Sequence, residues 1–205
     1  MGMENSEAYI RFINLLNANG PVKKDGYDPQ TMEKIFDWER DEVEDLVWEY
    51  FYNQGDNELC DLLPKLRKYD GMNALKERVS RLKIPSYASV VVSKVLYDCT
   101  GEESYLEIVK RNIDAEPNNI AYVSNLAFCK TSEKQYEMLK DIYINNEDNI
   151  NRGIAVRGML YVRGIMQSVD GIDDVLRTKE FREKFKSDSK KERKVIIKRF
   201  EEGKL

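Results

Sequence analysis

Hydrophobic positions between about residues 85 and 162 follow helical spacing and break at polar turns. One stripe has members three, four and seven positions apart: Val92, Val95, Leu96 and Cys99. Side chains at these intervals line one face of an α-helix. The polar segment 101–104 interrupts the pattern, and a second stripe follows: Leu106, Val109 and Ile113. The spacing predicts two short helices joined by a tight turn, with Pro117-Asn-Asn ending the second helix.

The pair of stripes recurs with a period of thirty residues. A shift of thirty positions brings Leu96 onto Leu126, and a second shift brings Leu126 onto Val156. Cys99 and Cys129 coincide in the same way. Counting backwards in steps of thirty gives further apolar matches to about residue 30. These matches predict a helix over about 59–66. A fixed period of this length predicts a repeat array whose neighbouring helix pairs bury each other's apolar faces.

The segment Leu62-Leu63-Pro64-Lys65-Leu66 resembles the Leu-Leu-Pro-x-Leu sequence in the first helix of a HEAT unit. Asp70-Gly71 occupies the turn, although the Val-Arg pair that usually follows the family's Asp is missing. The resemblance covers about residues 30–162. It implies an all-α fold, a right-handed α-solenoid of about four to five two-helix HEAT-like or armadillo-like repeats with capping helices at both ends.

The length of 205 residues, 41% of them hydrophobic, suits one domain or one short array. We expect a single α-helical repeat domain over residues 1–205. An opening helix over 6–18, capped by Ser6, is stopped by Asn19-Gly20-Pro21, and the repeats occupy about 30–166.

The tail, residues 177–205, is basic, with twelve Lys or Arg against six Asp or Glu, in a chain whose net charge is −4. Its last helix carries a narrow apolar stripe of Ile196, Ile197 and Phe200. This pattern favours a terminal cap, which solenoids need. A contact with nucleic acid or an acidic lipid surface is the alternative.

Composition argues against most catalytic chemistry. The chain has no histidine, and none of its three cysteines lies in a Cys-x-x-Cys pair. We find no nucleophile motif or phosphate-binding loop and therefore predict a non-catalytic protein without cofactor or metal. Cys99 and Cys129 fall on core stripes, which predicts buried thiols in a reducing, cytoplasmic compartment.

No apolar run reaches the roughly 18 residues that a membrane span needs. The N-terminal residues also lack the pattern of a secretory signal. Abundant Asn, Lys, Ile and Tyr suggest an AT-rich bacterial genome.

The predicted helix over about 149–165 contains three Arg-Gly pairs, which begin at Arg152, Arg157 and Arg163. Internal glycines cost roughly 1 kcal/mol each against alanine, so close packing of a neighbouring helix is expected to offset them. The arginines could form an anion site or pair with acidic residues of the next unit. Ion pairs within the protein are the favoured interpretation.

The helix predicted over 41–54 has an apolar stripe of Val43, Leu46, Val47 and Tyr50. Its opposite face combines aromatic and acidic residues, and we identify these as candidate partner-binding residues: Asp41, Glu44, Asp45, Trp48, Glu49 and Tyr52. Aromatic side chains ringed by carboxylates are typical of an interface with a basic partner. The alternative is that Trp48 is buried against the opening helix or Phe36.

These observations favour a protein-binding α-solenoid that acts as an adaptor, scaffold or inhibitor, for which bacterial toxin-immunity proteins offer a family-level analogy. The expected partner is another protein with a basic surface. The alternative is a nucleic-acid-binding HEAT-like protein related to the DNA alkylation repeat glycosylases. The acidic net charge disfavours nucleic acid. A hydrolase or metal enzyme is the least favoured class.

Overall fold

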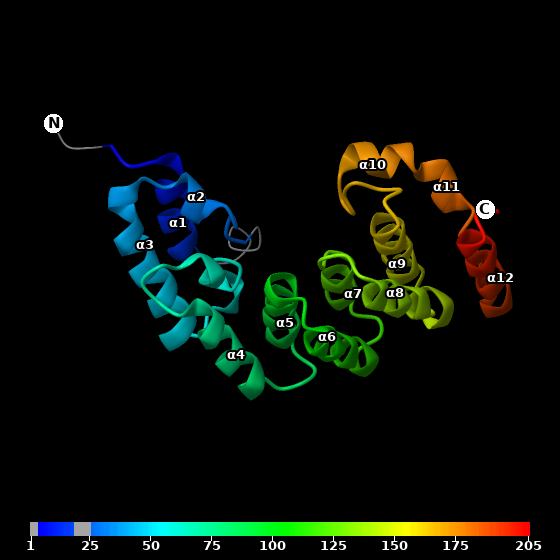
Figure 1. The fold of residues 1–205 in the computed structure, drawn as a ribbon, viewed down its shortest axis with the longest axis horizontal. Helices are drawn as coiled ribbons and strands as arrows, with labels where there is room; N and C mark the ends of the chain where they lie inside the picture. Colours follow the sequence, from blue (N-terminus) through cyan, green and yellow to red (C-terminus); the bar gives the residue numbers. More distant parts are fainter. Residues whose placement is uncertain (1–3, 19–25) are drawn as a thin grey trace. The chain divides into compact units, whose positions relative to one another are not determined.

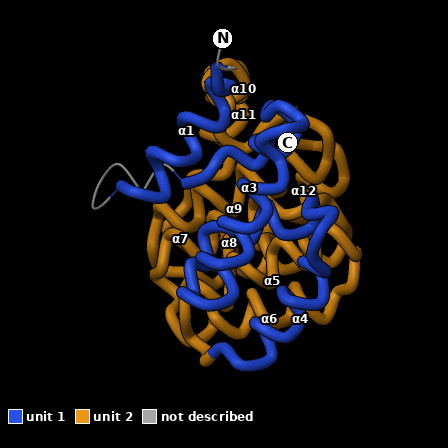
Figure 2. Tube along the Cα trace, turned by 90° about the vertical axis from the view of Figure 1, so that its left-hand side faces the viewer, with its two compact units in different colours: residues 1–82 blue, residues 83–205 orange. Residues whose placement is uncertain are grey.

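The computed structural model describes residues 4–18 and 26–205. All regular elements in these two ranges are helical, with no strand among them (Figure 1), so the expected all-α fold class is confirmed. Backbone contacts divide the chain into two compact units, Met1–Leu82 and Lys83–Leu205 (Figure 2). The expected stop signal at Asn19-Gly20-Pro21 lies outside the described residues.

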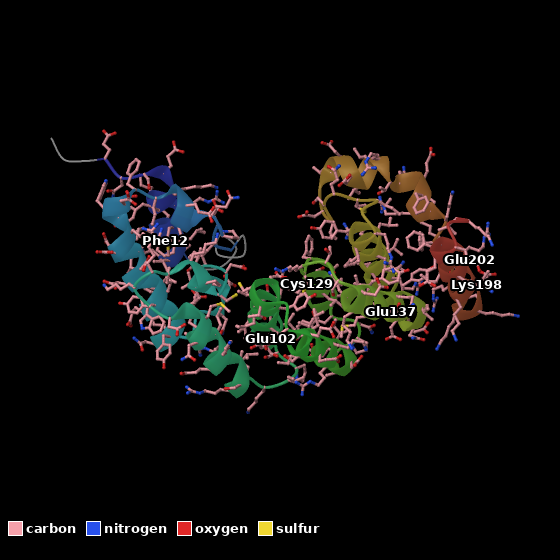
Figure 3. The ribbon with its side chains drawn as sticks, viewed as in Figure 1. Phe12, Glu102, Cys129, Glu137, Lys198 and Glu202 are labelled. Atoms are coloured by element: carbon pink, nitrogen blue, oxygen red, sulfur yellow. The ribbon has the colours of Figure 1, made fainter. Side chains whose placement is uncertain are left out.

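Unit 1 contains α-helices and short helical turns of other types. Its elements are α1 (Glu7–Leu16), α2 (Thr31–Lys34), α3 (Asp37–Trp48), η2 (Glu49–Asn53), η3 (Asn57–Leu59), η4 (Leu63–Lys65) and α4 (Gly71–Arg81). Helix α1 begins where the sequence predicts, because the Ser6 hydroxyl accepts a hydrogen bond from the Tyr9 amide. Phe12 of α1 is buried inside the unit (Figure 3), with its ring centroid 5.7 Å from that of Tyr27.

A buried carboxylate ties the start of α1 to the start of α3. Glu39 accepts hydrogen bonds from the Ser6 amide at 2.7 Å, from the Ser6 hydroxyl at 2.6 Å and from the Phe36 amide at 2.8 Å. Burial by itself would raise the pKa of Glu39, but these hydrogen bonds outweigh it and lower the pKa. The ionised side chain therefore fixes both helix starts in one place.

Helix α3 continues directly into η2, which is a π-helical turn. The wider π turn keeps positions four residues apart on one face, so the buried stripe runs through Val43, Val47 and Phe51. The predicted stripe placed Tyr50 in the core instead, and that detail is wrong because Tyr50 is only partly buried.

The helix predicted over 59–66 is replaced by the two 3-10 turns η3 and η4. Pro64 has no backbone N–H, and its ring clashes with the preceding turn of an α-helix, so a continuous α-helix does not form. Leu62 and Leu63 are nevertheless fully buried, whereas Leu66 is partly exposed. The apolar spacing thus predicted burial here correctly and the backbone conformation incorrectly.

Unit 2 is built from paired helices followed by a tail. Its elements are α5 (Tyr87–Thr100), α6 (Glu103–Ala115), α7 (Ile120–Ala127), α8 (Glu133–Asn145), α9 (Asn149–Val162), α10 (Ile172–Arg177), α11 (Lys179–Glu183) and α12 (Lys190–Glu201). The predicted breaks at 101–104 and 117–119 are both present. Helix α5 ends at Gly101, whose φ of +72° is the left-handed conformation that glycine adopts at helix ends.

Two rows of helices enclose the core of unit 2. Helix α7 packs between α5 and α9 in one row, while α6 and α8 contact each other in the second row (Figure 1). Leu96, Leu126 and Val156 lie in these helices at successive thirty-residue steps, and all three are buried as predicted.

The two cysteines that share a position in the thirty-residue period differ in the structure. Cys129 is buried, as predicted, but Cys99 is exposed, so that prediction is wrong. Helix α5 continues through Cys99 to Thr100, whereas α7 stops at Ala127 and leaves Cys129 in the following turn. Equivalent positions in the period therefore have different backbone conformations.

Tight packing explains one of the three glycines of the Arg-Gly pairs. A Cβ atom on Gly158 would lie 2.7 Å from Leu139 Cδ1 and 3.0 Å from Ala127 Cβ, so only glycine allows this approach. A Cβ on Gly153 would contact nothing. Ion pairs within the protein form, as predicted, at Arg163, which binds both carboxylate oxygens of Glu133, and at Arg152, which binds Asp188. Glu133 lies in the preceding helix α8, however, and not in the next unit as expected.

Helix α12 packs against α8. Ile197 is buried in the core, and Ile196 and Phe200 pack against that core, as the apolar stripe predicts. Arg193 is also buried, and its guanidinium donates to the backbone oxygens of Ile144, Ser187 and Asp188. The basic tail is therefore integrated into unit 2 by apolar and polar contacts.

We predict that Cys129 resists thiol reagents in the folded protein. Burial raises the pKa of this thiol to about 12, so the reactive thiolate is scarce at neutral pH. Peptide mapping by mass spectrometry should find Cys129 unlabelled in native protein and labelled in urea. Rapid labelling without denaturant would contradict the prediction.

We predict that Ile197→Ala lowers the free energy of unfolding by about 2–5 kcal/mol, because it leaves a cavity between α12 and the core. Val195→Ala on the same helix is the matched control, since Val195 is exposed, and it should change stability by less than about 0.5 kcal/mol. Urea unfolding of both variants measures the difference. Equal effects would show that α12 does not contribute to the core.

Candidate partner-binding face on helix α3

A stack of three aromatic rings lies on the surface of unit 1 where α3 passes into η2. Trp48 stands between Tyr52 and Tyr69, with ring centroids 4.9 Å and 4.5 Å away and interplanar angles of 7° and 8°. Trp48 and Tyr69 are partly buried and Tyr52 is exposed. The indole is therefore stacked between two tyrosine rings and is not fully buried, and Tyr52 is the exposed member of the stack.

The candidate carboxylates beside this stack differ in what they contact. Asp45 accepts hydrogen bonds from the Lys68 ammonium and the Tyr69 hydroxyl, and these hold its pKa below the ordinary value. Glu49 accepts from the Asn53 amide. Asp41 is exposed and has no ion pair or hydrogen bond from a side chain in the described ranges. Asp41 is consequently the candidate carboxylate most available to a partner.

Glu44 does not lie on the surface. Its side chain is buried and accepts hydrogen bonds from the backbone amides of Arg67 and Lys68, at 2.9 Å and 2.7 Å, and from Arg40 Nε at 2.8 Å. Arg40 also donates to the backbone oxygens of Met32 and Lys65. Glu44 therefore has a structural role beneath the surface, and its prediction as a residue that contacts a partner is wrong because its side chain is buried.

The structure adds aromatic residues that the candidate set lacked. Trp38 is 48% exposed at the start of α3, and its ring stacks on that of Phe36, which is 49% exposed. Trp38 lies three residues before Asp41 and seven before Asp45, so helical spacing places all three on one face. The sequence contains this spacing, but the predicted helix begins at Asp41 and therefore omits Trp38. Tyr69 carried no such signal because it comes from a separate segment.

A groove of about 410 Å³ runs beside this face, between the first half of α3 and the segment 67–68. Its lining residues carry charges of both signs and are Asp37, Arg40, Asp41, Glu44, Arg67 and Lys68. We define the α3 face as Trp38, Asp41, Asp45, Trp48 and Tyr52. It combines exposed aromatic area with carboxylates and a charged groove, which are features of a protein-binding surface.

In residues 4–18 and 26–205 no group of three His, Cys, Asp or Glu side chains is arranged to hold a metal ion. The helices described there also include none that is both long enough and apolar enough to cross a bilayer.

We predict that Glu44→Ala lowers the free energy of unfolding by about 3–5 kcal/mol, because it leaves the Arg40 charge and two backbone amides without their acceptor. Asp41→Ala is the matched control on the same helix and should stay within about 0.5 kcal/mol of the wild type. Denaturant unfolding of the full chain measures both values. A stable Glu44→Ala protein would contradict the supporting role.

Comparison of the chain with protein-family models, with curated proteins and with solved structures finds no match.

Proposed function

We propose that this protein is a non-catalytic, protein-binding helical-repeat protein whose α3 face binds a partner with a basic surface. The observation that carries the proposal is the exposure of Trp38 and Tyr52, with the partly buried Trp48 between them on the same helical face as Asp41. Tryptophan and tyrosine are the residue types most enriched among energetically dominant interface contacts. An adaptor, a scaffold or an inhibitor of the toxin-immunity type would each act through such a face.

The proposed architecture is a right-handed α-solenoid of about four to five HEAT-like repeats with capping helices. Support comes from the two helix rows in unit 2 and from the burial of Leu96, Leu126 and Val156 at thirty-residue steps. Docking of α12 on α8 supports a terminal capping role for the tail. Repeat proteins of this kind use extended surfaces to bind other proteins.

A basic partner fits the charges that the chain leaves unmatched on this face. The charge of Asp45 is already matched by Lys68, whereas Asp41, and Asp37 in the neighbouring groove, have no basic side chain paired with them within the described part of the chain. Lys or Arg side chains of a partner would meet these two carboxylates and pack along the neighbouring aromatic rings.

Nucleic-acid binding is the alternative function. It would use the basic residues of α12, but Arg193 in that helix is buried and bound to backbone carbonyls. The net charge of −4 also disfavours a polyanionic ligand. Binding of duplex DNA at low salt would favour this alternative over a protein partner.

The test combines capture with variants of single residues. The tagged 205-residue chain is used to capture partners from a lysate of the source cell, and each candidate is purified for affinity measurement. Trp38→Ala should weaken binding by about 2 kcal/mol or more, because an exposed aromatic contact is lost. Asp41→Asn should mainly slow association and reduce its salt dependence.

Phe128→Ala is the matched control for Trp38→Ala, since Phe128 is an exposed aromatic residue in unit 2. Asp173→Asn on α10 is the control for Asp41→Asn, since Asp173 is also exposed. Both controls should bind as the wild type does. Equal losses for control and test variants, with unchanged circular dichroism, would place the binding face elsewhere.

A further inference from the structure

Unit 2 contains a pocket of about 430 Å³ between α9 and the segment 182–188, a volume within the range of small-molecule sites. The apolar part of its wall is formed by Tyr143, Val156 and Phe185. The charged side chains of the wall are Arg152, Arg182, Glu183, Lys186 and Asp188. The pocket therefore suits a molecule with an apolar body and a charged group.

Four of these five charged side chains are paired with one another. Arg152 binds Asp188 at 3.1 Å, and Lys186 binds Glu183 at 2.6 Å. The fifth is Arg182, which has no carboxylate partner in the described ranges. The unmatched charge in the pocket wall is thus the positive charge of Arg182.

The guanidinium of Arg182 is held in place by uncharged acceptors. Its Nη2 donates to the Val175 backbone oxygen at 2.6 Å, and its Nε donates to the Thr178 hydroxyl at 3.3 Å. Its Nη1 has no acceptor within the described residues. An anion would therefore find a positioned guanidinium that still has free N–H donors.

A second positive charge without a carboxylate lies directly behind the pocket wall. Arg193 is buried, and its Nη1 donates to the backbone oxygens of Ser187 and Asp188, two residues that line the pocket. Its other donors bind the Ile144 backbone oxygen. Because a buried charge is weakly screened, Arg193 favours an anion over a cation in the pocket without touching it.

The apolar part of the wall lies close to Arg182 along the chain and is fixed by its own contacts. The Phe185 amide donates to the Arg182 backbone oxygen at 3.0 Å, so these two residues are joined by one helical turn. The Tyr143 hydroxyl donates to the Phe185 backbone oxygen at 2.7 Å, and the two rings lie edge to face at 5.7 Å. A short distance between ring and charged group in the ligand matches this arrangement.

Gly153 leaves the opposite wall of the pocket, on α9, without a side chain. Glycine is unfavourable in a helix interior, and a Cβ atom at this exposed position would have no neighbour within 4 Å. Packing therefore does not require glycine here, in contrast with Gly158, where a Cβ would collide with Leu139. The missing side chain lets an occupant approach the helix backbone.

We propose that this pocket binds a small aromatic monocarboxylate. The carboxylate accepts hydrogen bonds from Arg182, and the ring packs against Phe185 and Val156. The planar guanidinium matches the geometry of a carboxylate, and a single negative charge matches the one unmatched cation in the wall. The site belongs to unit 2 alone and does not depend on the α3 face.

Benzoate is the probe, because it has both parts of the proposed ligand. Isothermal titration calorimetry of the 205-residue chain should give saturable binding of one benzoate per chain. Benzamide has the ring without the charge and acetate has the charge without the ring, so both should bind at least about tenfold more weakly. Benzylamine, which carries a positive charge on a similar ring, should not bind.

Two charge variants should change the affinity in opposite directions. Arg182→Gln should weaken benzoate binding by about tenfold or more, because a charge-assisted hydrogen bond is lost. Asp188→Asn should tighten it by about threefold, because a negative charge leaves the pocket wall. The side chain of Asp188 is fully exposed, so this gain cannot arise from a folding defect.

Each charge variant has a matched control outside the pocket. Arg111→Gln on α6 and Asp173→Asn on α10 change the net charge equally at exposed positions and should bind benzoate as the wild type does. Gly153→Leu should melt at the same or a higher temperature, because leucine favours a helix, yet lose binding because its side chain occupies the pocket.

The absence of saturable binding at millimolar benzoate would overturn the proposal. Equal affinity for benzamide or benzylamine would do so as well. Wild-type affinity in Arg182→Gln, Asp188→Asn or Gly153→Leu would also contradict it.

Discussion

The buried carboxylate of Glu44 is the interaction on which the exposed face of unit 1 depends. It joins α3 to the segment 67–68 through two backbone amides, while Arg40 neutralises its charge and extends to the backbone oxygens of Met32 and Lys65. A buried charge is costly unless it is paired and hydrogen-bonded, and here both conditions hold. Tyr69 follows this anchored segment directly, so its ring reaches Trp48 and the aromatic stack forms.

In unit 2, buried polar side chains also hydrogen-bond to backbone groups of other segments, here at the ends of helices. The last carbonyls of a helix lack partners within it, and buried polar side chains from other helices supply them. Gln135 of α8 donates to the Leu126 and Cys129 oxygens near the end of α7, and Arg193 of α12 donates to the Ile144 oxygen near the end of α8. These contacts fix where each helix ends against its neighbour, which apolar packing alone would leave adjustable.

The charged residues of α3 and α9 fall into two kinds. A charged group that is paired inside the chain has a structural role, whereas an unpaired charged group is available to a ligand. Arg163 and Arg152 have carboxylate partners and hold neighbouring segments together. Arg157, on the same helix, has none in the described ranges. On α3 the same contrast separates the buried Glu44 from the exposed Asp41. Residue type alone did not distinguish the members of either pair.

The sequence by itself determined the helical class, the turns after α5 and α6, and the burial of Leu96, Leu126, Val156 and Ile197. Apolar spacing and glycine or proline breaks report which face of a helix avoids water, and these signals are local. Only the tertiary structure decided that Cys99 is exposed, that Glu44 is buried and that Tyr69 stacks on Trp48. Each of these depends on where a helix ends relative to its neighbours, or on which distant backbone group meets a side chain. The spacing of apolar residues along the chain reports neither where a helix ends against its neighbour nor which distant backbone group a side chain meets.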